Sequence, residues 1–277
     1  MSQAPAVSVV IPCWRCAETI ERAVASVAGQ TLSALEVVLV DDASSDGTLD
    51  KLRALTKIYQ AGWVKVIALR DNGGPGLARN AGWGEARGEF IAFLDADDAW
   101  HPRKLELHMN WLASHPEVVL SGHRSVLLRD GAVPPRVEEA LTARRVTLLA
   151  MLLSNRFPTR SVVIRRSLPF RFEGRSVTED YLIWLEVVAS GAPCYVLDAP
   201  LAMSFRPDFS PDGYSGQLWR HERRELAALS MLRSRGKLKW AGWAVASVWS
   251  LAKFCRRVWL TRVHRAGTAP RQIESRI

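Results

Sequence analysis

The sequence is poor in cysteine and lacks the segments that mark export. Its 277 residues include four cysteines, too few and too scattered for a disulfide framework. No basic N-terminal segment is followed by an apolar run, so a secretory signal is not predicted. No internal repeat or low-complexity segment is visible. These absences favour a cytoplasmic, reducing compartment for the cysteines, which are Cys13, Cys16, Cys194 and Cys255.

Acidic residues are almost missing from the C-terminal part of the chain. Residues 233–277 contain eleven Lys/Arg and a single acid, Glu274, so the net charge of this segment is about +10. The net charge of the whole chain is +9. The remaining residues are therefore close to neutral. The composition, with 48% apolar residues, is sufficient for a substantial core. We expect one globular domain over residues 1–232 and a basic, Trp-rich helical tail over residues 233–277.

Four short apolar segments rich in β-branched residues predict buried strands. They cover residues 7–12, 36–42, 64–69 and 89–94, and a helical pattern follows each of the first three. Strands and helices that alternate in this way predict an α/β fold with a mostly parallel sheet and helices on both faces. Ligands of such sheets bind beyond the carboxyl ends of the strands. The polar residues that follow these strands should therefore converge in space.

The second half of the chain gives weaker patterns. Residues 105–115 predict an amphipathic helix, and residues 117–131 predict two short strands. Residues 161–166 predict another strand, and residues 178–191 predict a helix that begins with acids and ends at Gly191.

Aspartates gather at the ends of the second and fourth predicted strands. Asp41 and Asp42 end the second, and Asp95, Asp97 and Asp98 follow the fourth. Like charges packed this closely repel one another. The fourth cluster is therefore either a solvated turn, which aspartate favours, or a site for a positively charged group.

Five segments in order, "VSVVIP", "VLVDDASSDGT", "NGGPGLARNAG", "GEFIAFLDADD" and "TEDYLIWL", resemble glycosyltransferase family 2. The resemblance runs from about Val7 to Gly191 and implies the GT-A fold of inverting nucleotide-sugar transferases, with a Rossmann-like sheet. It divides the globular part into a nucleotide-sugar-binding half, residues 1–115, and an acceptor-binding half, residues 116–232. The chain departs from the family pattern at Trp14 and Arg15, where an aromatic residue is more often followed by asparagine.

The resemblance implies roles for residues on the donor side. Asp95 and Asp97 are similar to the DxD motif, which implies that they bind a divalent cation, Mn²⁺ or Mg²⁺. Hard cations of this kind prefer oxygen ligands and stabilise a leaving diphosphate. Asp42 is similar to the residue that accepts a hydrogen bond from uracil, with Asp41 as its support, although both could simply cap the following helix. Pro12 is similar to a residue lining the nucleotide pocket.

Arg79 lies in a Gly-rich segment that leads into a predicted helix. The glycines permit close approach of the backbone. The resemblance implies that Arg79 contacts the diphosphate. A structural role, in which Arg79 and Asn80 tie the helix to the sheet, is an equal alternative.

The segment "TEDYLIW" resembles the family's acidic motif before the catalytic helix. The resemblance implies that Asp180 is the catalytic base, that Glu179 could share this role, and that Trp184 forms part of a wall facing the sugar or acceptor. Alternatively, the two acids merely favour the N-terminus of a helix.

The tail contains 13 uncharged residues, 240–252, between basic clusters. This run is too short for a spanning helix, which needs about 20 apolar residues. Trp240, Trp243, Leu251, Phe254 and Val258 recur at helical spacing, and we expect the basic residues Lys239, Lys253 and Arg257 on the other side. The pattern predicts that residues 237–260 lie on an anionic membrane surface. A helix packed on the domain with a solvated basic face is the alternative.

Together these features predict a metal-dependent, inverting glycosyltransferase that uses a nucleotide-sugar, most simply UDP-linked. We expect a glycan or lipid-linked acceptor in bacterial cell-surface polysaccharide synthesis, at the inner face of the membrane. One rival is a nucleotidyltransferase on a similar sheet, which would not need the acidic helix. A second is a basic nucleic-acid-binding protein, supported by the basic tail alone; the Trp-rich run in that tail favours a membrane, so no nucleic acid partner is expected.

Overall fold

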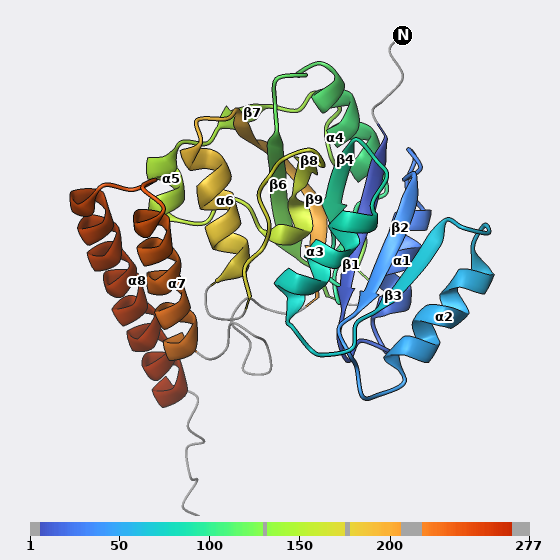
Figure 1. Cartoon of the computed structure of the whole chain (residues 1–277), viewed down its shortest axis with the longest axis horizontal. Coiled ribbons are helices and arrows are strands. Elements are labelled where there is room, and N and C mark those ends of the chain that lie inside the picture. Colours follow the sequence, from blue (N-terminus) through green and yellow to red (C-terminus); the bar gives the residue numbers. More distant parts are fainter. Residues whose placement is uncertain (1–5, 130–131, 175–177, 206–217, 268–277) are drawn as a thin grey trace, which may run out of the picture.

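The computed structural model of the chain describes residues 6–129, 132–174, 178–205 and 218–267 (Figure 1). Its strands are β1 (Val7–Cys13), β2 (Glu36–Asp41), β3 (Val64–Ala68), β4 (Phe90–Phe93), β5 (Ala99–Trp100), β6 (Leu120–Leu127), β7 (Ala143–Arg145), β8 (Val163–Arg165) and β9 (Cys194–Ser204). Its helices are α1 (Ile20–Ala28), α2 (Thr48–Ile58), α3 (Pro75–Glu85), α4 (Lys104–Ala113), α5 (Leu148–Leu153), the 3₁₀ helix η1 (Thr159–Ser161), α6 (Glu179–Ala189), α7 (Leu218–Ser234) and α8 (Trp240–Gly267).

The strands form one sheet of nine, in the order β3-β2-β1-β4-β8-β6-β9-β5, with β7 paired to β9. The first four strands are parallel to one another, as predicted, because a helix returns the chain after each of β1, β2 and β3. Beyond β4 the sheet is mixed: β8 is antiparallel to both β4 and β6, while β6 and β9 are parallel. The predicted α/β fold is confirmed, together with a helical C-terminal region, and the predicted parallel pairing is found among β1–β4.

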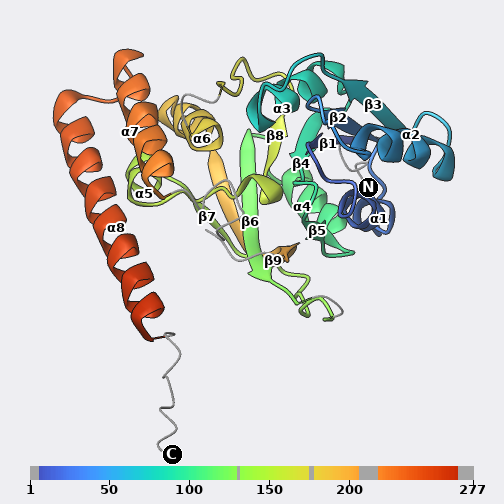
Figure 2. The same ribbon diagram turned by 90° about the horizontal axis from the view of Figure 1, so that it is seen from below.

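Side chains alternate between two cores on opposite faces of the sheet. In β1, Val9 and Ile11 face the core beneath α1, α2 and α4, whereas Val10 faces the core beneath α3 and α6. Figure 2 shows the two groups of helices on opposite sides of the sheet. Such strands are covered on both faces, which explains why they read as continuous apolar runs rather than as alternating ones.

Helices α7 and α8 form an antiparallel hairpin at one edge of the molecule (Figures 1 and 2). The hairpin is joined by charged groups: Lys253 Nζ lies 2.9 Å from Glu225 Oε1, and Arg257 Nη2 lies 2.8 Å from Glu222 Oε2. Ser250 Oγ also donates to Glu222 Oε1, at 2.8 Å. The expected tail helix therefore packs on the domain, but its basic residues Lys253 and Arg257 face α7 rather than solvent. The predicted domain boundary at residue 233 lies within α7.

Residues 120–127 form one strand, β6, and not the two short strands that the sequence predicted. Gly122 lies within this strand and permits close packing, since a Cβ there would lie 2.9 Å from Phe157 Cδ1. The predicted helix over residues 105–115 is confirmed as α4, and the predicted strand over residues 161–166 as β8.

Candidate functional site

The polar ends of β1, β2 and β4 lie side by side, because β1 is the neighbour of both other strands. The amide of Asp42 donates to the Cys13 carbonyl at 2.8 Å, and the amide of Leu94 donates to the Val10 carbonyl at 3.2 Å. This register brings Asp41 and Asp42 to the same edge of the sheet as the loop that begins at Asp95. The predicted convergence of the aspartates therefore follows from the strand order.

Asp42 anchors the turn that leads into α3. Its Oδ1 and Oδ2 accept hydrogen bonds from the backbone amides of Gly73 and Gly74, each at 2.8 Å. Gly74 has a φ of 92°, a conformation that favours glycine. Asp41 Oδ2 accepts from the Ser44 amide at 3.3 Å, but its buried Oδ1 has no partner within the described residues. The vacant acceptor of this pair is thus on Asp41.

Arg79 lies at the centre of the candidate site. Its Nη2 lies 2.7 Å from Asp95 Oδ1, and its side chain is 7% exposed. The guanidinium also packs over the ring of Phe172, with 5.4 Å between Cζ and the ring centroid. Of the two roles open from the sequence, this buried ion pair supports the structural one, since Arg79 ties α3 to the loop after β4.

The loop after β4 is held from two sides. Arg22 Nη2, from α1, donates to the carbonyl of Asp97 at 2.8 Å. Arg160 Nη1, from η1, lies 3.3 Å from Asp98 Oδ2. Burial, assisted by the nearby charge of Asp95, raises the pKa of Asp98 to about 7, against the opposing effect of Arg160. Asp98 is thus a buried support of the loop.

Glu179 and Asp180 begin α6, opposite this loop. Asp180 Oδ1 accepts from its neighbour's amide, Tyr181 N, at 2.8 Å, and Oδ2 accepts from Thr159 Oγ1 at 3.4 Å. Burial raises the pKa of Asp180, while Arg79 opposes this shift. Burial and then the charge of Asp180 raise the pKa of Glu179 to about 7.

The close approach of α3 and α6 depends on one glycine. A Cβ on Gly76 would lie 2.7 Å from the carbonyl oxygen of Glu173 and 2.8 Å from Glu179 Cγ. Both distances are too short for any larger residue without displacement of the backbone. Gly76 therefore sets the distance between the Arg79 helix and the acids of α6.

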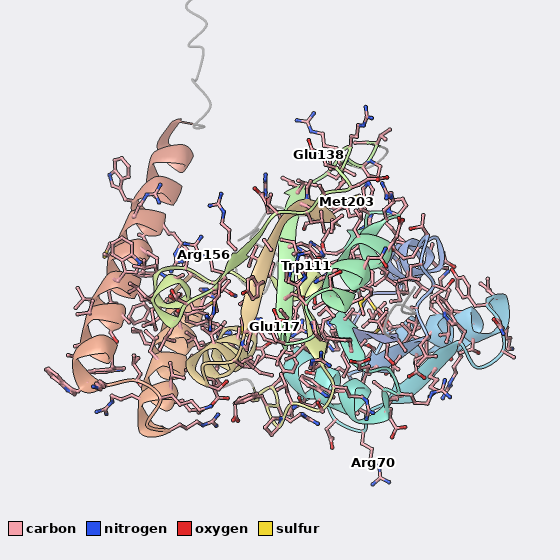
Figure 3. All side chains as sticks on the ribbon, turned by 90° about the horizontal axis from the view of Figure 1, so that it is seen from above. Arg70, Trp111, Glu117, Glu138, Arg156 and Met203 are labelled. Carbon is pink, nitrogen blue, oxygen red and sulfur yellow. The ribbon has the colours of Figure 1, made fainter. Side chains whose placement is uncertain are left out.

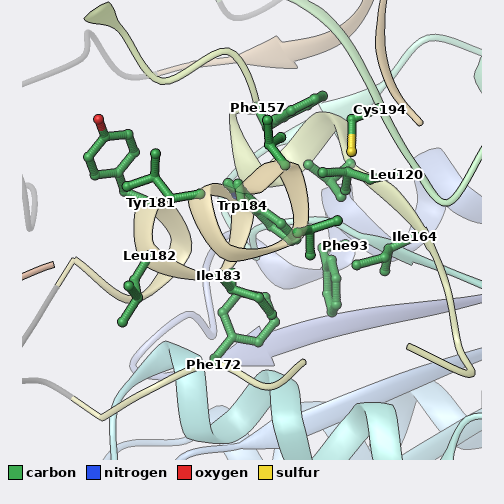
Figure 4. Close-up of a cluster of buried hydrophobic side chains, with 14 of the residues drawn as sticks. Phe93, Leu120, Phe157, Ile164, Phe172, Tyr181, Leu182, Ile183, Trp184 and Cys194 are labelled. Atoms are coloured by element: carbon green, nitrogen blue, oxygen red, sulfur yellow. The ribbon is translucent and has the colours of Figure 1, made fainter. Parts of the chain in front are cut away.

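Trp184 does not face an acceptor, and this corrects the prediction from the sequence. Its side chain is fully buried, with ring centroids 6.2 Å from Phe93 and 5.5 Å from Phe172 (Figure 4). Helix α6 is surrounded by the sheet, α5 and α7, so its residues 181–188 are buried around the whole circumference. The indole thus belongs to the core beneath the site.

The residues present fit a divalent cation that is completed by substrate. No group of three or more potential metal ligands occurs within the described part of the chain. Asp95 and Asp97 nevertheless supply carboxylate oxygens at the edge of the sheet, and Mg²⁺ or Mn²⁺ commonly takes its other ligands from water and phosphate. Pro12, near the carboxyl end of β1, lies beside Val40 of β2 at this edge.

The 3₁₀ helix η1 also belongs to the site, although the sequence did not predict it. Thr159 contacts Asp180, and the next residue, Arg160, contacts Asp98, so this short helix links the two acidic groups. Trp100 Nε1 fixes η1 by donating to the Arg160 carbonyl at 2.8 Å. The available signal was the polar "PTRS" before the strand at residue 163, which pairs with β4.

The class of protein follows from this fold and site. The mannosyltransferase PcManGT of Pyrobaculum calidifontis, solved with GDP-Man and Mn²⁺, superposes with a TM-score of 0.68 at 19% identity, over 97% of this chain and 77% of that one. At this identity the likeness shows the fold, which is that of a GT-A glycosyltransferase.

The sequence comparisons place the chain in a particular family. The profile described as Glycosyl transferase family 2 matches residues 8–173. A Bacillus subtilis glycosyltransferase named for teichuronic acid biosynthesis, TuaG, is 30% identical over 72% of this chain and 78% of its own length. WfgD of Escherichia coli, named as a UDP-Glc:α-D-GlcNAc-diphosphoundecaprenol β-1,3-glucosyltransferase, is 29% identical over 66% of this chain and 69% of its own. The protein belongs to glycosyltransferase family 2.

Proposed function

We propose that the protein transfers a sugar, with inversion, from a UDP-sugar to a hydroxyl of a glycan or lipid-linked acceptor in cell-surface polysaccharide synthesis. The observation that carries this proposal is the ion pair of Arg79 with Asp95, on a helix that Gly76 brings close to the acids of α6, since a Cβ there would lie 2.8 Å from Glu179 Cγ. The name of TuaG supports the polymer class, and that of WfgD supports a UDP-linked donor and a lipid-linked acceptor. Such an acceptor would place the enzyme at the inner face of the cell membrane.

We propose that the nucleobase of the sugar donor binds at the edge formed by β1 and β2. The vacant, buried Oδ1 of Asp41 can accept the ring N–H of uracil, while Asp42 holds the Gly73–Gly74 turn. This assignment exchanges the roles that the resemblance gave to the two residues. Pro12 lines the same edge.

Asp95 and Asp97 would hold a divalent cation beside the diphosphate. A bound Mn²⁺ or Mg²⁺ would supply positive charge that stabilises the diphosphate as it leaves. The Asp95 carboxylate is already oriented by Arg79, and the backbone at Asp97 is held by Arg22. These contacts position the oxygen ligands before any cation arrives.

Asp180 is the proposed base. The acceptor hydroxyl oxygen forms a bond to the anomeric carbon while the bond from that carbon to the diphosphate breaks, and the diphosphate keeps the electron pair. The hydroxyl proton passes to the Asp180 carboxylate. Burial, which raises the pKa of Asp180, makes this carboxylate a stronger proton acceptor. Attack on the face opposite the leaving group in one step inverts the anomeric configuration.

The first test is thermal stability of the protein with UDP, GDP, dTDP and their sugars, each with and without Mn²⁺. We expect a stabilising shift for UDP and its sugars that needs the cation and disappears in Asp97→Ala. An equal shift in Asp97→Ala would contradict the metal assignment. Release of pyrophosphate from a nucleoside triphosphate would instead indicate a nucleotidyltransferase.

A further inference from the structure

Helix α8 exposes a continuous apolar stripe. Ala241, Val245, Val248, Ala252, Cys255 and Trp259 follow one another at alternating spacings of four and three residues, and all are exposed. These spacings place side chains on one face of a helix. Val245 is 71% exposed, Val248 68% and Trp259 63%. The side chains of Trp249 and Leu251, 46% and 40% exposed, widen the stripe on either side.

The opposite side of α8 explains why this stripe must face outward. Lys253 and Arg257 pair with Glu225 and Glu222 of α7, and the Trp243 indole donates to Ser230 Oγ at 3.2 Å. Phe254 contacts Trp219 of α7, with ring centroids 5.5 Å apart. The hairpin therefore fixes the rotation of α8. Trp243 and Phe254, which the sequence assigned to a lipid-facing stripe, lie against α7 instead.

Helix α5 extends the apolar surface. Trp249 Nε1 donates to the carbonyl of Leu153 at 3.0 Å, which joins the two helices. Leu149 and Leu153 of α5 are 66% and 42% exposed. A shallow groove on α8 is lined by Ala244, Val245, Val248, Trp249 and Ala252. We call the exposed apolar residues of α5 and α8, taken together, the α5–α8 face.

The charged residues of α8 and of residues 148–156 are all basic. No acidic residue occurs between Glu225 and Glu274, and none occurs in residues 148–156. Exposed Arg256 lies beside the stripe on α8, and Arg156, the third residue after α5, extends away from the fold (Figure 3). An apolar face on elements whose own charged residues are all basic is complementary to a surface that is apolar inside and anionic outside.

We propose that the α5–α8 face binds the interfacial region of an anionic lipid bilayer. Trp240, Trp249 and Trp259 are spaced along the exposed helix, and indoles prefer the headgroup level of membranes. No helix within the described residues is long and apolar enough to cross a bilayer. Helix α8 thus lies along the surface, with its apolar side chains inserted about 5–10 Å into the boundary region.

A second copy of the chain fits this face less well. A two-helix seam needs a narrow apolar stripe, whereas the exposed apolar side chains here extend from Leu251 across to Trp249 and onto α5. A symmetric contact would also bring Arg256 of both copies into a region that offers no acid. Lipid phosphates, in contrast, would supply the negative charge that Arg256 lacks in such a contact.

The orientation of α8 relates the membrane to the site. Its C-terminal end lies at the same end of the molecule as the N-termini of α6 and α7 (Figure 1). Asp180, near the N-terminus of α6, would therefore face the region where a lipid-linked hydroxyl approaches. This last step alone rests on the proposed function; lipid binding itself does not.

Cys255 allows a direct test on the full chain. It is exposed within the stripe, whereas Cys13, Cys16 and Cys194 are buried, so an environment-sensitive fluorophore should label Cys255 selectively. On phosphatidylglycerol vesicles we expect a blue shift of its emission and co-sedimentation of the protein, both weaker on phosphatidylcholine and at high salt. No blue shift and no co-sedimentation with phosphatidylglycerol would overturn the proposal.

Paired variants distinguish binding through the α5–α8 face from nonspecific adsorption to vesicles. Val245→Glu with Val248→Glu should lower the vesicle partition coefficient at least about tenfold, while Ile58→Glu, a change at a 65% exposed residue of α2, should leave it unchanged. Equal loss in both would contradict the assignment of the face. Sedimentation without lipid tests whether a second copy of the chain covers the α5–α8 face. If the wild type forms a dimer and does not bind vesicles, and the double variant is monomeric, the face mediates self-association and the lipid proposal is wrong.

These outcomes are independent of the transferase proposal. Nucleotide-dependent thermal stability and transfer to a water-soluble acceptor should be the same in the double variant and the wild type. Transfer by a wild-type protein that does not bind vesicles would show failure of the lipid proposal alone, whereas vesicle binding by a wild-type protein that transfers no sugar would leave the lipid proposal standing.

Discussion

Two acidic clusters in this molecule differ in how far their carboxylates are paired with basic residues. In the α7–α8 hairpin, Glu222 and Glu225 are matched by Arg257 and Lys253. At the candidate site, Arg79 pairs with Asp95 and Arg160 pairs with Asp98, while Glu179 and Asp180 form no ion pair within the described part of the chain.

This difference distinguishes a structural cluster from a functional one. Matched charges hold two helices together and have nothing left to bind. Unmatched buried carboxylates are costly to keep ionised, so their presence suggests that a cation or a proton arrives during function. The hairpin cluster therefore serves as an internal reference for the site.

The largest effect is expected from removal of the proposed base. Asp180→Asn should lower the rate of transfer about 10²- to 10⁴-fold, because the amide cannot accept the hydroxyl proton. Binding of the nucleotide, measured by thermal shift, should remain. Turnover at the normal rate would refute the assignment of Asp180, and the matched change in the reference cluster, Glu225→Gln, should leave the rate per folded molecule intact.

A glycine exchange tests how closely the two sides of the site must approach. Gly76→Ala places a methyl group 2.7 Å from the Glu173 carbonyl oxygen, so we expect about 1–3 kcal/mol of lost stability and reduced transfer. Gly84→Ala on the same helix meets nothing within 4 Å and should stabilise the protein by up to about 1 kcal/mol. Chemical denaturation measures both, and equal effects would show that the contact at Gly76 is unimportant.

The unmatched acids predict a pH dependence of stability. The pKa of Glu179 in the folded protein is raised to about 7. The protonated Glu179 therefore contributes to the free energy of unfolding fully below the unfolded-state pKa, near 4.5, and this contribution is lost as pH rises to 7. The contribution is on the order of 1–3 kcal/mol. Without metal, the wild type should therefore lose stability relative to Glu179→Gln between pH 4.5 and 7. Parallel pH profiles of the two proteins would contradict this.

Glu36 is expected to give a pH dependence of stability opposite in sign to that of Glu179. Contacts with Lys65, Ser8 and Arg87 outweigh burial and lower its pKa from 4.5 to about 2. Its contribution to stability is therefore present above pH 4.5 and is lost as pH falls toward 2. Glu36→Gln should change the acid limb of the profile and leave the neutral limb unchanged.

The smallest effect is expected in the hairpin. Glu222→Gln keeps a side-chain acceptor for Ser250 but removes the charge facing Arg257, which is 24% exposed. A partly solvated pair of this kind contributes about 1 kcal/mol. Denaturation should show this loss, with transfer per folded molecule unchanged; a loss of activity would mean that the hairpin also shapes the site.

The nucleotide-binding half was readable from sequence because its determinants are local. Each of the first four strands is a continuous apolar run, and each aspartate cluster directly follows a strand. Strand order then forces Asp41, Asp42 and the Asp95 loop together. The burial of Trp184 was not readable, since "YLIW" fits equally well a helix with one exposed side and a helix enclosed on all sides.

By itself the sequence determined the α/β class, the family and the positions of the acidic clusters, because periodicity and strand-end residues act over short distances. Only the tertiary structure decided how those groups are paired: Arg79 with Asp95, η1 with both acidic groups, and Glu222 and Glu225 with the basic residues of α8. It also decided which side of α8 faces outward. Pairing and rotation depend on contacts between residues far apart in the chain, and a helical pattern specifies which residues share a face but not what covers that face.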